Sequence, residues 1–108
     1  MEEKQELIQA LNNDFPINLR NGAGMEELQA RLSNYINDLI VHHFNQLINL
    51  LYRLDVSEKK LQQWLLENTT EDAGKIIADL IIERQLQKIK SRNQHKQQDE
   101  NISDDEKW

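Results

Sequence analysis

Asp38, His42 and His43 are the residues of this chain whose types come closest to a metal site. Asp38 and His42 are four residues apart, so on a helix their side chains would lie one turn apart on the same face. His43 would point about 100° away from His42, and the two imidazoles could not bind one ion from the same side. The spacing therefore predicts a solvated Asp–His pair, with His43 as a partly buried residue of an apolar stripe.

No other group of residues predicts catalysis or cofactor binding. No serine or threonine has a predictable general base, and the run "NGAG" at residues 21–24 lacks both the preceding strand and the lysine of a phosphate-binding loop. The chain has no cysteine, which excludes disulfides and thiolate metal ligands. We therefore expect a non-enzymatic protein that binds no metal and no cofactor.

Residues 50–66, "LLYRLDVSEKKLQQWLL", weakly resemble a helix-turn-helix, a motif that reads DNA with its second helix. Four polar side chains of that helix would contact DNA in this alternative: Lys59, Lys60, Gln62 and Gln63. The fit is incomplete, because Leu51 stands where the motif needs a small residue. The outward side chains of the second helix also carry two positive and two negative charges, which disfavours a phosphate backbone.

A capped connector between two packed helices explains the same residues more simply. Ser57 is a preferred N-cap residue, and Glu58 suits the positive end of the helix that follows it. Val56 and Leu61 have the spacing of a hydrophobic staple. Asp55 tolerates the left-handed conformation that a tight turn requires.

A run of basic residues, "ERQLQKIKSRNQHK", follows the last strongly apolar stretch. It contains a candidate basic patch of five residues: Arg84, Lys88, Lys90, Arg92 and Lys96. Basic residues at the C-terminal end of a helix are also expected from the helix dipole alone. The acidic residues beyond this run could fold back and mask it.

Hydrophobic periodicity predicts an all-α fold, a small bundle of three to four helices. The expected domain, residues 1–92, contains helices over residues 2–13, 25–55, 58–68 and 71–92. Residues 14–24 carry the only proline and two of the three glycines, and predict a loop. Residues 93–108 form an acidic tail with too few apolar side chains to offset the entropy of ordering, so we expect disorder there.

Composition narrows the class of partner. The chain of 108 residues has a formal net charge of −6, which disfavours nucleic acids and anionic membranes as partners. Its first residues are acidic where a signal peptide is basic, and no apolar run approaches the ~20 residues that span a bilayer. These features predict a cytoplasmic protein without a membrane partner.

Residues 39–92 contain the runs "LLYRLDVSEKKL" and "AGKIIADLIIERQLQKIKSR". In these runs the chain resembles a small, all-helical bacterial family to which no activity is assigned. The resemblance covers half of the chain and implies a cytoplasmic protein. It carries no substrate, cofactor or catalytic residue across.

Helix lengths predict self-association. A helix over residues 25–55 would be roughly 46 Å long, and the shorter helices that follow it would cover mainly its second half. An apolar stripe on its first half would then need a second copy of the chain as cover: Met25, Leu28, Leu32, Tyr35 and Leu39. We therefore expect a helical protein-interaction module that forms a homodimer or binds another helical protein, with a DNA-binding regulator as the alternative.

Overall fold

The computed structural model describes residues 3–67 and 72–101, and these residues form helices joined by short connections. In chain order the helices are α1 (Glu3–Asp14), α2 (Met25–His42), α3 (Phe44–Arg53), α4 (Glu58–Glu67) and α5 (Ala73–Asn101). The all-α prediction is confirmed over this part of the chain, which holds five helices where three or four were expected. None of these helices is long and apolar enough to cross a membrane.

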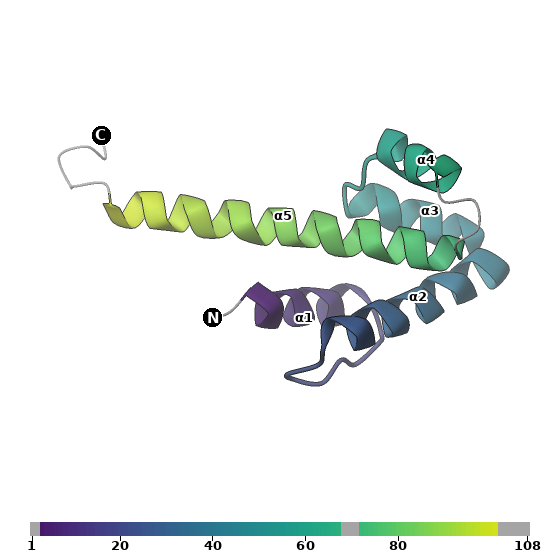
Figure 1. Cartoon of the computed structure of the whole chain (residues 1–108), viewed down its shortest axis with the longest axis horizontal. Coiled ribbons are helices and arrows are strands. Elements are labelled where there is room, and N and C mark those ends of the chain that lie inside the picture. The colour runs from purple at the N-terminus through teal and green to yellow at the C-terminus, as the bar shows by residue number, and fades with distance from the viewer. Residues whose placement is uncertain (1–2, 68–71, 102–108) are drawn as a thin grey trace.

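Helix α5 runs along the middle of the molecule, with α1 and α2 on one side and α3 and α4 on the other (Figure 1). Two hydrogen bonds show that α1 is antiparallel to α5: Asn93 Nδ2 donates to Glu6 Oε2 at 3.0 Å, and Gln85 Nε2 donates to Asp14 Oδ2 at 3.1 Å. The three large apolar side chains of α1, Leu7, Ile8 and Leu11, are buried in one cluster with those of α2, α3 and α5.

The single long helix predicted over residues 25–55 is wrong, because the chain leaves the helical conformation at His43 (φ −145°, ψ 57°). The His43 N–H still donates to the Leu39 carbonyl at 2.8 Å, and its own carbonyl accepts from the Leu47 N–H at 3.2 Å, so neither helix end loses these bonds. The break lets α2 and α3 bury apolar side chains in the same cluster. His43 itself is exposed, which corrects its expected partial burial.

The break also explains why the predicted dimer stripe is wrong. Helix α2 has only 18 residues, and α5 packs along it in the antiparallel direction. Leu28 and Leu32 are 0% exposed and Leu39 is 2% exposed, so the chain covers this stripe itself. Of the five predicted interface residues, Tyr35 is half-buried and Met25 is the most exposed, at 39%.

The connection between α1 and α2 supplies part of that cover. Its apolar side chains Phe15, Ile17 and Leu19 are buried, although the sequence predicted only a loop here. The Phe15 ring meets the Tyr35 ring edge to face, with centroids 5.8 Å apart. The connection therefore belongs to the core of the protein.

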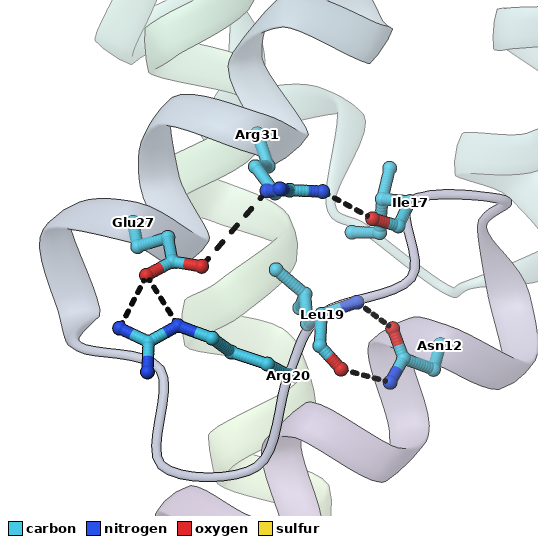
Figure 2. A network of polar contacts seen from close by, with 6 residues as sticks. All are labelled: Asn12, Ile17, Leu19, Arg20, Glu27 and Arg31. Atoms are coloured by element: carbon cyan, nitrogen blue, oxygen red, sulfur yellow. Dashed lines mark hydrogen bonds and ion pairs between the residues drawn. The ribbon is translucent and has the colours of Figure 1, made fainter.

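A polar network holds this connection against α1 and α2 (Figure 2). The Asn12 side chain accepts from the Leu19 N–H at 2.7 Å and donates to the Leu19 carbonyl at 3.0 Å, much as a neighbouring strand would. Arg31 donates to the Ile17 carbonyl at 3.0 Å, while Arg20 and Glu27 form an ion pair at 3.1 Å. These bonds satisfy backbone groups of a segment that has no regular secondary structure.

Helix α5 starts in close contact with α2. The Asp72 carboxylate links α2 to α5. It accepts one hydrogen bond from the Asn37 side chain of α2 at 2.8 Å and another from the Gly74 N–H of α5 at 3.0 Å. A Cβ atom at Gly74 would clash with the side-chain amide of Asn37. Glycine at this position lets the first turn of α5 approach α2.

The far end of α5 corrects the predicted tail. The structure continues the helix to Asn101, whereas disorder was expected from residue 93. Residues 75–101 contain neither glycine nor proline, and their many Gln, Lys and Arg residues favour a helix even without burial. The remainder of the predicted tail, residues 102–108, lies outside the described residues.

Candidate protein-interaction surface

Helix α3 buries one face and exposes another that is also apolar. Leu47, Leu50 and Leu51 point into the core. Phe44, Ile48 and Tyr52, spaced by four residues, are 55%, 48% and 88% exposed. We refer to these three exposed side chains as the α3 stripe.

A groove between α3 and α4 borders the α3 stripe. It encloses a volume of about 270 Å³, and eight residues line it: Ile48, Leu51, Tyr52, Val56, Glu58, Leu61, Gln62 and Leu65. Six of these eight side chains are apolar or aromatic, and Glu58 is the only charged one. The groove therefore suits an apolar or amphipathic segment better than a charged ligand.

The tight turn at residues 54–57 sets the position of α4 beside α3. Asp55 has a positive φ of 63°, as the turn reading of the sequence required, and the Val56 N–H donates to the Leu51 carbonyl at 3.2 Å. The Ser57 hydroxyl accepts from the Lys60 N–H at 3.2 Å, so Ser57 is the N-cap of α4. Val56 and Leu61 both pack against the core.

Replacing Ser57 with alanine is expected to lower the free energy of unfolding by about 0.5 to 2 kcal/mol, because the Lys60 N–H loses its cap. Chemical denaturation would measure this change. Lys59→Ala is the control, since Lys59 is exposed on the same helix turn, and it is expected to stay within about 0.5 kcal/mol of the wild type. Equal effects from the two changes would contradict the capping role.

Two residues of the predicted basic patch hold the end of α3 instead of forming a free surface. Arg84 Nε donates to the Asp55 carbonyl at 3.1 Å, and its Nη2 meets the Asp55 carboxylate at 2.9 Å. Lys88 Nζ donates to the Leu54 carbonyl at 2.9 Å. These contacts satisfy carbonyl groups at the C-terminal end of α3 and tie the turn to α5.

The other three residues of the predicted patch lie farther along α5. Lys90 and Arg92 are exposed on α5, and the side chain of Lys96 lies outside the described side chains. Of the four patch residues whose side chains are described, two therefore stabilise the fold and two face solvent.

The four predicted DNA contacts are divided in a similar way. Lys60 pairs with Glu83 of α5, and its ammonium lies 5.5 Å from the centre of the Trp64 ring. Gln63 donates to Glu67 at 3.0 Å. Lys59 and Gln62 are exposed, and Gln62 lines the groove. The α3–turn–α4 geometry is present, but α4 offers one exposed lysine to a phosphate backbone and not a basic face.

The histidines occupy the corner between α2 and α3. His42 Nε2 lies 3.8 Å from Asp38 Oδ1. The His42 side chain is 64% exposed and the Asp38 side chain 60%, which agrees with the predicted solvated pair. The rings of His42 and His43 are tilted with centroids 6.5 Å apart. Within residues 3–67 and 72–101, no group of three or more His, Cys, Asp or Glu side chains could hold a metal ion.

The α3 stripe was not identified as a site from sequence. The four-residue spacing of Phe44, Ile48 and Tyr52 is visible in the sequence, but spacing alone does not distinguish an exposed apolar helix face from a buried one. Comparisons of the chain with protein-family models, curated proteins and solved structures found no match.

Proposed function

We propose that this protein is a non-enzymatic protein-interaction module that binds its partner through the α3 stripe and the adjoining groove. The observation that carries the proposal is the exposure of Phe44, Ile48 and Tyr52 on one face of a single helix. Soluble domains rarely leave neighbouring large apolar side chains open to water unless the surface is used for binding. Aromatic side chains are also enriched among the residues that dominate binding energy.

The α3 stripe lies on a helix that the rest of the fold holds in place. The opposite face of α3 is packed into the core, and Arg84 and Lys88 of α5 hold the turn that follows it. A preformed surface loses less conformational entropy on binding than one that must order first. Together with α4, it forms a groove of the kind that takes an amphipathic helix by its apolar face.

Photo-crosslinking in the source cell tests this proposal. A photoreactive phenylalanine analogue placed at Tyr52 is expected to give a defined protein adduct, and Ile48→Glu in the same chain should abolish it. The same analogue at Gln9, an exposed position on α1, is the matched control and should give no adduct of that mass. No adduct from position 52, or the same adducts from both positions, would contradict the proposal.

A DNA-binding regulator remains the alternative function. It would be favoured over the interaction module if duplex DNA bound tightly at physiological salt and Lys59→Ala with Gln62→Ala abolished that binding. Both residues are exposed on α4, so their replacement should leave the fold unchanged.

A further inference from the structure

We infer that the partner at the α3 stripe is a second copy of this chain, docked through α3 about a two-fold axis close to Ile48. The inference rests on the proposed function and names the occupant of the same surface. Self-association was expected at the stripe that α2 buries, and the structure leaves α3 as the apolar helix face that is still exposed along its length among the described residues.

The distribution of charge favours a second copy. The chain has 13 basic and 19 acidic residues, yet residues 39–52 contain none of either kind. Near a two-fold axis each side chain lies close to its own symmetry mate, so any charged residue there would face a like charge. The exposed apolar face therefore lies where an acidic chain can meet itself without repulsion.

The spacing of the α3 stripe is self-complementary. In an antiparallel pair of α3 helices, Ile48 meets Ile48 on the axis, and Phe44 of each copy lies against Tyr52 of the other. Side chains four residues apart form the ridges that interdigitate in the commonest class of helix packing.

The area available for the contact is small. A covered aromatic side chain buries about 150–250 Å². At exposures of 55% and 88%, Phe44 and Tyr52 together supply on the order of 300 Å² per copy. A standard stable interface buries about 800 Å² per partner. Ile48 and the groove lining add to the aromatic area without making the surface extensive, so we expect a dimer that dissociates in the micromolar range.

Light scattering behind size-exclusion chromatography, over a concentration series of the purified chain, tests the inference. The wild type should approach twice the 12.8 kDa chain mass at about 100 µM and fall toward one chain mass on dilution. Ile48→Glu and Tyr52→Glu should each remain at one chain mass throughout. Because Tyr52 is 88% exposed, its replacement cannot act through the core.

Two controls locate the interface. Met25→Glu makes the same change at an apolar residue that is 39% exposed at the N-terminal end of α2, and it should leave the dimer intact. An equimolar mixture of Ile48→Glu and Ile48→Lys chains should regain twice the chain mass, because position 48 faces itself across the axis. A dimer that survives Ile48→Glu, or is lost with Met25→Glu, would overturn the inference.

Light scattering and crosslinking together distinguish a failure of the second-copy inference from a failure of the proposed function. A wild type that stays at one chain mass while position 52 still crosslinks to a different protein overturns the second copy and supports the interaction module. A wild type at one chain mass with no adduct from position 52 overturns both.

Discussion

Replacing Leu28 and Leu32 together with glutamate is expected to unfold the protein, although the sequence alone had placed both residues in a separable dimer interface. Both side chains are 0% exposed, in one cluster with the core residues of α5 and of the α1–α2 connection. A buried charge without a partner costs several kcal/mol, so two of them approach the about 5–15 kcal/mol by which a whole domain is stable.

The measurement is far-UV circular dichroism with a thermal scan, in which the double variant should lose most of its helicity and its cooperative transition. Ala30→Glu with Asn34→Glu is the matched control, because it adds the same two charges at the same spacing on exposed positions of α2. This control should keep a cooperative transition, with a small loss from like charges one turn apart. A folded, monomeric Leu28→Glu/Leu32→Glu protein would show instead that α2 is covered by a second copy.

Phe15→Ala is expected to lower the free energy of unfolding by about 3 to 5 kcal/mol, the usual cost of removing a buried aromatic side chain. Phe15 is 2% exposed and meets Tyr35 edge to face, so the change leaves a cavity and removes an aromatic contact. Urea denaturation followed by circular dichroism would measure the loss.

Gln9→Ala serves as the control for Phe15→Ala, because Gln9 is exposed on the adjoining helix α1. It should change stability by no more than about 0.5 kcal/mol. If Phe15→Ala were equally neutral, the connection between α1 and α2 would not be part of the core. The cover over α2 would then have to come from α5 alone.

The absence of a strand from the described residues, and the starts of α2 and α4, were visible in the sequence because they depend on signals within a few residues. Ser57 caps α4 as its type and position predicted. Asp55 adopts the left-handed conformation that its place in the turn required. Leu7, Ile8 and Leu11 share a face of α1 because the helical period fixes which residues lie together.

The candidate surface and its supports were decided by contacts between distant segments. Lys88 lies 34 residues from the Leu54 carbonyl that it binds, and no local rule distinguishes such a lysine from one that faces solvent. Phe15 and Leu19 are likewise buried, although the composition of residues 14–24 predicted only a loop.

The sequence by itself determined the helical class and the local caps, since backbone hydrogen bonds and helical periodicity are satisfied within a few residues. Only the tertiary structure decided that the chain breaks at His43, because the break contains no glycine or proline and joins two helices that pack into one core. The break makes α2 short enough for α5 to cover it. It also leaves several apolar side chains of residues 39–52 exposed outside the core. An apolar stripe shows that a face must be buried, but what buries it depends on the arrangement of every other helix.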